Sequence, residues 1–205
     1  MNGPGSRVEI RRATVADLDS SAAVLGAAFA DYPWTRWTVD ADDHVIRITA
    51  LQRLALEHYG LAFGHVWLAL VEGMTASVAV WLDSGVVVPR DVDDLLGEDV
   101  ARLEGSRHAA SLGAEAELDG WRPRERHYFL ATVGTLPTRQ GRGLGRAVLG
   151  PTLAAADEDG VAAALETSSM ANVDFYARLG FEVVERRTIS GGGPEVWMMI
   201  RPPGR

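Results

Sequence analysis

Apolar and polar residues alternate in several short runs of this chain, which is the pattern of a β-strand with one buried face. Residues 7–12 alternate Val8 and Ile10 with charged side chains, and residues 65–82 contain two apolar runs separated by Glu72 and Gly73. A glycine-containing pair between two such runs is typical of a hairpin turn. We therefore expect one strand over 7–12 and a hairpin over 65–82.

Other segments have the helical period. Leu18, Leu25 and Phe29 share one face of a helix that Thr14 can cap, and a second helix is predicted over 43–59. Pro33 interrupts the pattern, so we expect the aromatic-rich segment 30–40 to be irregular.

Strands and helices continue to mix toward the C-terminus. Residues 86–121 are rich in Ala, Glu and Leu and are predicted to be helical. The expected C-terminal elements are strands over 126–136 and 161–167, helices over 142–158 and 172–179, and two final strands joined through Gly191–Gly193. This mixture predicts an α/β or α+β class with one mainly antiparallel sheet.

Composition narrows the function classes. The 205 residues are 47% hydrophobic, which suits a single domain over 1–205 with an ordinary core. The net charge of −8 argues against a nucleic-acid partner, which would need a basic face. There is no cysteine, so disulfides, thiolate metal ligands and a cysteine nucleophile are excluded, and no metal is expected.

No run of apolar residues approaches the roughly 18 that span a membrane, and the N-terminus lacks the apolar region of a secretory signal. We therefore expect a soluble, cytoplasmic protein with no membrane partner. All 20 basic residues are arginine, so neither Schiff-base chemistry nor a lysine-dependent P-loop is available.

Candidate chemistry gathers in residues 135–149, TLPTRQGRGLGRAVL. Glycine lets a backbone approach a ligand closely, and the arginine fork matches phosphate oxygens. The segment follows a predicted strand and opens a predicted helix, whose first N–H groups and positive dipole end favour an anion. The residues expected to hold a pyrophosphate are Arg139, Gln140, Gly141, Arg142, Gly143, Leu144, Gly145 and Arg146.

Two other interpretations of this segment are open. One is a glycine-rich turn with solvated arginines. The other is a dinucleotide site, because Glu166 follows Gly145 by about 20 residues, where a ribose-binding acid belongs. Against it, the glycines at 141, 143 and 145 do not match G-x-G-x-x-G, and four residues separate the strand from the first glycine.

Residues 140–145, QGRGLG, match the [RQ]-x-x-G-x-[GA] signature of the GNAT N-acetyltransferase superfamily, and Asn172 with FYARLGF at 175–181 resembles its second signature. Three longer segments, AAFADYPWTRWTVD, FLATVGTLPTRQGRGLG and ALETSSMANVDFYARLGF, are similar to the puromycin N-acetyltransferases of that superfamily. The resemblance implies a GNAT fold, in which helices flank a splayed, mostly antiparallel sheet of six to seven strands. It also implies acetyl-CoA as co-substrate and direct attack by an amine.

The resemblance implies roles for individual residues as well. Val133, Gly134 and Thr135 would offer backbone groups to the pantetheine, one of them as oxyanion donor. Tyr176 would be the proton donor to the leaving thiolate, and Asn172 would cap its helix or reach the cofactor.

The base and the acceptor are less determined. Glu166, at the end of a strand, is the best acidic candidate for the base; it could instead orient the substrate or be a buried paired carboxylate, and His127 is an alternative base. Asp31, Tyr32 and Trp34 combine a carboxylate with aromatic rings and suit a cationic aromatic amine.

We therefore expect an acetyl-CoA-dependent N-acetyltransferase of a small amine, puromycin or a related aminonucleoside antibiotic. The first alternative is a GNAT-fold sensor that binds acyl-CoA without catalysis. The second, which the sequence favours less, is a dinucleotide-binding protein. The sequence leaves open the identity of the amine and whether the chain is a monomer or a homodimer.

Overall fold

A computed structural model describes residues 7–204, apart from the side chains of Arg90 and Asp93. The strands are β1 (Val8–Arg12), β2 (Gly64–Val71), β3 (Met74–Asp83), β4 (His127–Thr135), β5 (Ala162–Thr167), β6 (Glu182–Thr188) and β7 (Glu195–Arg201). The helices are α1 (Leu18–Phe29), α2 (Pro33–Thr38), α3 (His44–Ala55), α4 (Leu61–Phe63), α5 (Arg90–Glu104), α6 (His108–Asp119), α7 (Leu144–Asp159) and α8 (Met170–Ala177).

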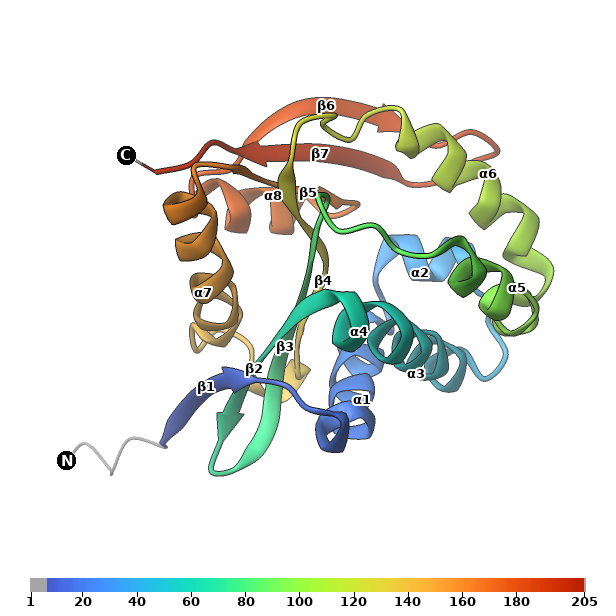
Figure 1. The fold of residues 1–205 in the computed structure, drawn as a ribbon. Coiled ribbons are helices and arrows are strands. Elements are labelled where there is room, and N and C mark those ends of the chain that lie inside the picture. Colours follow the sequence, from blue (N-terminus) through green and yellow to red (C-terminus); the bar gives the residue numbers. More distant parts are fainter. Residues whose placement is uncertain (1–6, 205) are drawn as a thin grey trace.

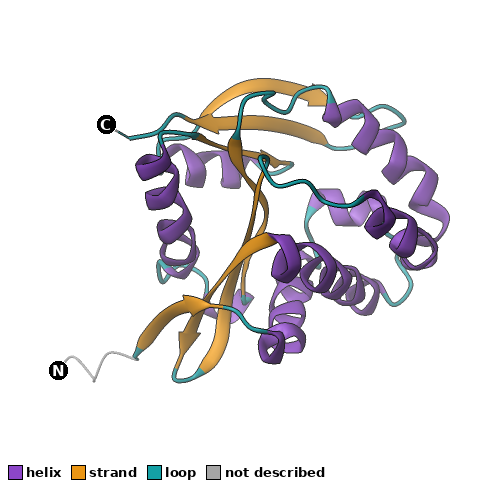
Figure 2. Cartoon of the chain, in the orientation of Figure 1, coloured by secondary structure: helices purple, strands orange, loops and turns teal. Residues whose placement is uncertain are grey.

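The described strands form one sheet in the order β1-β2-β3-β4-β5-β7-β6. Every neighbouring pair is antiparallel except β4 and β5, which run parallel and are joined by a crossover through α7 (Figure 1). Helices lie on both sides of this strongly twisted sheet (Figure 2). The expected fold class, a mostly antiparallel sheet flanked by helices, is confirmed. A doubly wound dinucleotide fold needs a mainly parallel sheet, so that alternative is wrong.

Alternation along β2 and β3 divides the core between the two faces. Leu68 and Val80 pack with α1, whereas Ala69 and Trp81 pack with α7. This is the period of two that was visible in the sequence, and it fixes which face each side chain meets. The Glu72–Gly73 turn has positive φ at both residues, the geometry of a tight hairpin, and the hairpin prediction is confirmed.

Three differences from the expected elements affect the site. Residues 33–38 form a short helix, because Pro33 occupies its first turn, where proline is favoured, and Tyr32 before it is extended. The helix after the glycine-rich loop begins at Leu144, since Gly143 adopts a left-handed conformation that a helix cannot contain. The last helix begins at Met170 with Ser169 as N-cap, so Asn172 lies inside the helix and does not cap it.

Candidate active site

The site begins where β4 and β5 part. Their parallel pairing covers His127–Leu130 and Ala162–Leu165 and then stops. At the same level β4 carries a bulge, because Leu130 and Thr132 pair with consecutive residues of β3 and Ala131 is left over. A bulge bends its strand and increases the local twist. The splayed sheet therefore has a local cause, one extra residue in β4.

The glycine-rich loop follows the free end of β4. Gly141 and Gly143 have φ of 73° and 77°, which only glycine adopts without strain, and Gly143 is the N-cap of α7. The first N–H groups of α7 have no intrahelical acceptor and carry the positive end of the helix dipole. Leu144 contributes only its backbone here, because its side chain is 4% exposed in the core.

Arginines surround this helix end. Arg142 and Arg146 are exposed and Arg139 is half-buried, and none of their three guanidinium groups has a hydrogen bond or an ion pair with another described residue. Gln140 donates from Nε2 to the carbonyl of Thr135, at 3.2 Å, and so holds the loop against the end of β4. Guanidinium groups without a partner, beside the N–H groups of a helix start, are an arrangement that favours a phosphate.

The resemblance implies that the backbone of Gly134, on β4, contacts the pantetheine. A Cβ added at Gly134 would lie 2.8 Å from Ala28 Cβ and 2.9 Å from Leu25 Cδ2, so the close approach is that of helix α1. The Gly134 carbonyl accepts a hydrogen bond from Ser77 Oγ at 3.0 Å, and Thr135 Oγ1 lies 2.8 Å from the same hydroxyl. Gly134 is thus explained by packing, while its neighbour Val133 lines the cavity described next.

A cavity of about 390 Å³ opens between the parted strands and the helices α1, α2 and α6. This volume lies within the range of sites for small-molecule ligands. Much of its wall is aromatic, from Phe29, Tyr32, Trp34, Tyr59, Phe129 and Tyr176. Its charged lining residues are Glu115, Arg122 and Glu166, which gives it two carboxylates against one guanidinium.

Tyr32 connects α2 to the end of β5. Its hydroxyl accepts a hydrogen bond from the backbone N–H of Ser168 at 2.7 Å and lies 2.9 Å from Thr167 Oγ1. Asn172 donates from Nδ2 to the same Thr167 hydroxyl, at 3.2 Å. Six of the predicted site residues therefore line one cavity: Tyr32, Trp34, Val133, Glu166, Asn172 and Tyr176.

Glu166 is paired. Arg122 donates from Nε to Oε1 at 3.0 Å and from Nη2 to Oε2 at 3.1 Å. The Glu166 side chain is 13% exposed. Engagement of both oxygens by a guanidinium favours the paired, orienting role that the sequence left open for Glu166 over that of a free base.

Tyr176 lies on α8 against Phe175 and Phe181, with ring centroids 5.1 and 5.7 Å away. Burial, and secondarily Tyr32, raises the pKa of the Tyr176 phenol far above its ordinary value of about 10. The phenol is therefore protonated throughout the physiological pH range. It lines the cavity together with Asn172.

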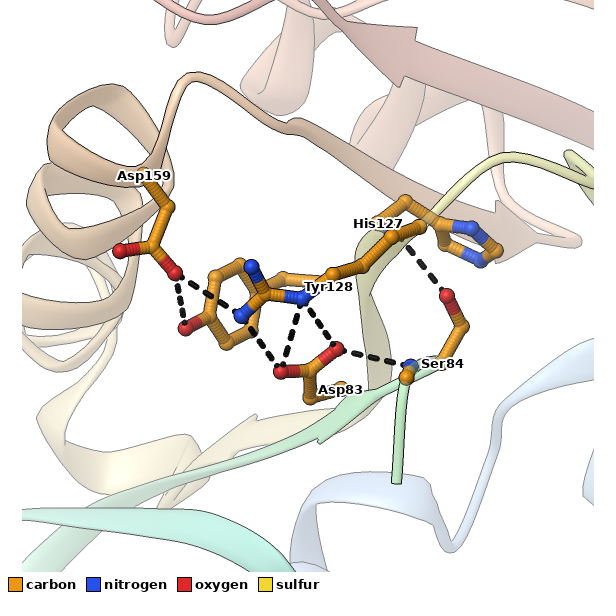
Figure 3. Close-up of polar contacts among 7 residues, drawn as sticks. Asp83, Ser84, His127, Tyr128 and Asp159 are labelled. Carbon is orange, nitrogen blue, oxygen red and sulfur yellow. Dashed lines mark hydrogen bonds and ion pairs between the residues drawn. The ribbon is translucent and has the colours of Figure 1, made fainter. Parts of the chain in front are cut away.

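Two expected residues lie elsewhere. Asp31 is exposed and does not line the cavity. His127 is at the first position of β4, before the bulge, where its backbone N–H donates to Ser84 Oγ (Figure 3). Beside it, Asp83 and Asp159 hold Arg126, and Asp159 also accepts from the Tyr128 hydroxyl. This cluster ties strand ends together, so the structure does not support His127 as the base.

Sequence reasoning missed Glu115 and Arg122, which no motif marks. It also missed two hydroxyls: Thr132 Oγ1 and Ser168 Oγ are buried without a hydrogen-bond partner in the described part of the chain, and both residues line the cavity. A buried hydroxyl without a partner is costly, so these two suggest groups that a ligand satisfies.

Residues 7–204 contain neither a metal-binding cluster nor a membrane-spanning helix. No group of three or more His, Asp or Glu side chains has the arrangement to hold a metal ion. No helix there has both the length and the apolar character needed to cross a membrane.

Comparison with known proteins agrees with this geometry. Residues 100–181, from α5 to the start of β6, match the model of the Acetyltransferase (GNAT) family. A solved structure from Corynebacterium glutamicum, described as histone acetyltransferase HPA2 and related acetyltransferase, is 26% identical, with 97% of each chain covered and a TM-score of 0.71.

Two further solved structures share the fold at lower identity. The ribosomal-protein-S18-alanine N-acetyltransferase of Escherichia coli is 18% identical, with 97% of this chain and 96% of that chain covered and a TM-score of 0.57. The putative acetyltransferase yncA of Salmonella typhimurium, solved with its cofactor acetyl-CoA, is 18% identical, with 98% and 96% covered and a TM-score of 0.55. The mixed sheet with its parted strands is therefore the GNAT fold.

Proposed function

We propose that this chain, a GNAT-type N-acetyltransferase, transfers the acetyl group of acetyl-CoA to the amine of a small aromatic cation, with puromycin or a related aminonucleoside antibiotic as acceptor. The observation that carries the proposal is the cavity at the point where β4 and β5 part. It combines aromatic walls with an excess of carboxylate, and β4, which lines it through Val133, leads into the glycine-rich loop with its exposed arginines. One site thus suits an amine and the other a coenzyme A pyrophosphate.

The coenzyme side rests on groups that have no other partner. The N–H groups at the start of α7 and the guanidinium groups of Arg139, Arg142 and Arg146 would hold phosphates. The backbone of Val133, Gly134 and Thr135, beyond the last β5 contact, would bind the pantetheine arm and supply an N–H to the oxyanion. The conformation of the loop would come from Gln140, Gly141, Gly143 and Gly145. Leu144 would donate its backbone N–H to a phosphate, and Asn172 would contact the coenzyme from the cavity.

The protein's own residues would contribute a proton donor for the thiolate and groups that orient the amine. Acetyl-CoA supplies an activated acyl carbon, which the amine attacks directly, since the chain has no cysteine to form an acyl-enzyme. Tyr176 holds a proton on its phenol oxygen for the departing thiolate. Its raised pKa makes it a weak acid, so it serves as a hydrogen-bond donor until negative charge develops on the sulfur. Glu166, fixed by Arg122, orients the amine.

The acceptor class is supported by two independent observations. The segments that resemble puromycin N-acetyltransferases include the β4 strand, the loop and residues 27–40, which contribute Phe29, Tyr32 and Trp34 to the cavity. Aromatic faces and net negative charge favour a cation that bears a ring. Tyr32 and Trp34 would contact that ring, and Asp31 would attract the cation from outside. Acetylation of the antibiotic would then confer resistance. We propose that the enzyme acts in the cytoplasm and that residues 1–205 form a single catalytic domain.

The test is a free-thiol release assay with acetyl-CoA and a panel of amines that includes puromycin, with mass spectrometry of the product. We expect thiol release and the mass increase of one acetyl group on puromycin. Turnover only on amines without an aromatic ring would reject the acceptor class. Binding of acetyl-CoA with no turnover on any amine would instead favour a GNAT-fold sensor.

A further inference from the structure

Glu115, on helix α6, is the second carboxylate of the cavity. Its Oε2 lies 3.4 Å from Arg122 Nη2, and its Oε1 has no hydrogen-bond partner among the residues that the structure describes. Glu166 differs, because Arg122 engages both of its oxygens. Glu115 is therefore the cavity carboxylate with an oxygen available to a ligand.

The position of Glu115 is set by the same arginine. Arg122 Nη2 contacts both carboxylates, so Glu115 lies beside Glu166, which directly follows the last β5 residue paired with β4, Leu165. The Arg122 guanidinium also stacks over the Phe129 ring, with Cζ 4.8 Å from the centroid. These contacts place the Glu115 carboxylate near the point where the strands part, where the proposed function requires the acetyl group to arrive.

We propose that Glu115 receives the ammonium group of the acceptor and is the general base of the transfer. The step rests on the proposed function. One N–H bond of the ammonium breaks and an O–H bond forms on Glu115, while the electron pair stays on nitrogen. That pair forms the C–N bond as the C–S bond of the thioester breaks. The departing thiolate takes a proton from the Tyr176 phenol. A second N–H bond of the acetylated nitrogen then breaks, its electron pair stays on nitrogen, and that proton restores the phenol, while Glu115 returns its own proton to solvent.

The surroundings of Glu115 suit a base. Neighbouring protein atoms displace water and raise the pKa of its carboxyl; Arg122 opposes this shift, and Glu166 on β5 and Glu104 on α5 add to it. Tyr32 and Tyr59 line the same cavity. A carboxylate whose conjugate acid has a raised pKa is a stronger base. The side chain is 51% exposed, so its proton can leave.

The test compares E115Q with E166Q and with E117Q, a control on the same helix that lies outside the cavity lining. We expect E115Q to lower kcat/KM at pH 7 about 100-fold and to abolish the acidic limb of the pH–rate profile. We expect E166Q to keep the acidic limb of the pH–rate profile. E117Q should keep both the wild-type kcat/KM and that limb. Acetyl-CoA affinity and the circular dichroism spectrum of E115Q remain those of the wild type.

Calorimetric titration with puromycin from pH 5 to pH 8 separates this proposal from the proposed function. Wild-type affinity falls as Glu115 is protonated, and E115Q loses this dependence. If the wild type acetylates no amine, but E115Q still loses the pH dependence of puromycin affinity, the proposed acetyl transfer is wrong. The binding of the ammonium group at Glu115 is then still supported. If E115Q keeps both the acidic limb of the pH–rate profile and the pH-dependent affinity for puromycin, the proposed role of Glu115 is wrong. It is also wrong if the wild-type protein binds no amine.

Discussion

Arg122 donates to both carboxylate oxygens of Glu166, at 3.0 and 3.1 Å, and its Nη2 reaches Glu115 as well. One guanidinium therefore separates the two carboxylates of the cavity. Bidentate pairs of this kind add geometric specificity to charge, and removal of the cation leaves like charges facing each other.

Replacing Arg122 by Met should lower the free energy of unfolding by about 2 kcal/mol, because charged hydrogen bonds are lost and two carboxylates remain unpaired. Urea unfolding at pH 7 measures this. In the double variant R122M/E166Q part of the loss should return, since one of the stranded charges is gone. Simple additivity of the two single changes would contradict the pairing.

Replacing Arg142 by Glu should weaken acetyl-CoA binding at least tenfold without changing the unfolding midpoint, because the side chain is exposed and has no partner in the described structure. Calorimetry checks the affinity. Arg124→Glu is the matched control: the same charge change, also exposed, before the opposite end of β4. Equal losses in both variants would mean a general charge effect rather than a phosphate contact.

Replacing Tyr176 by Phe should lower kcat about 100-fold and leave the KM for acetyl-CoA near its wild-type value, since only a proton donor is removed. Steady-state kinetics measures both. Tyr128→Phe serves as control, because it removes the hydrogen bond to Asp159 away from the cavity and should affect stability instead of kcat. An unchanged kcat in Y176F would remove the phenol from the reaction.

Replacing Thr132 by Val should keep or raise the stability of the free protein, by up to about 1 kcal/mol, because its buried hydroxyl has no partner in the described structure. The same change should weaken binding of ligands in the cavity. Thermal unfolding with and without acetyl-CoA and amine measures both effects. Ser77→Ala should instead lower the stability of the free protein, because Ser77 is hydrogen-bonded to Gly134 and Thr135.

Asp157 gives a pH dependence of stability. Hydrogen bonds from Arg201, and then from the Gly204 backbone, lower the pKa of Asp157 to about 2. Because this is below the unfolded value of about 3.9, the stabilisation is complete above pH 4 and is lost as the pH falls toward 2. Asp157→Asn should therefore cost on the order of 1 kcal/mol at pH 7, and progressively less between pH 4 and 2. A pH-independent cost would exclude this linkage.

The predicted features that the structure reproduces are local ones. The hairpin, the strands and the loop that opens α7 each depend on residues close together in the chain, where period and glycine placement carry the signal. Gly143 illustrates the limit of this reasoning. Glycine marked the loop correctly, but its left-handed conformation moved the helix start two residues past Arg142, where we expected it.

The features that were missed are contacts between distant segments. Arg122 meets Glu166 44 residues later, and Tyr32 meets Ser168 across 136 residues. Neither pair has a spacing that a sequence pattern could reveal, because only the closure of the sheet brings them together. Gly134 is a further example, because the group that closely approaches its backbone is α1, which no local pattern identifies.

The bulge at Ala131 changes which residues of β4 face which helix. Leu130 packs toward α7, whereas Thr132 and Gly134 pair with the β3 residues that face α1, so the even-numbered positions change sides across Ala131. Deleting Ala131 would keep every one of these side chains on its present face and would let β4 pair without interruption. The opening between the strands is thus encoded by the number of residues in β4, and a shortened chain could fold with its core preserved and the opening closed.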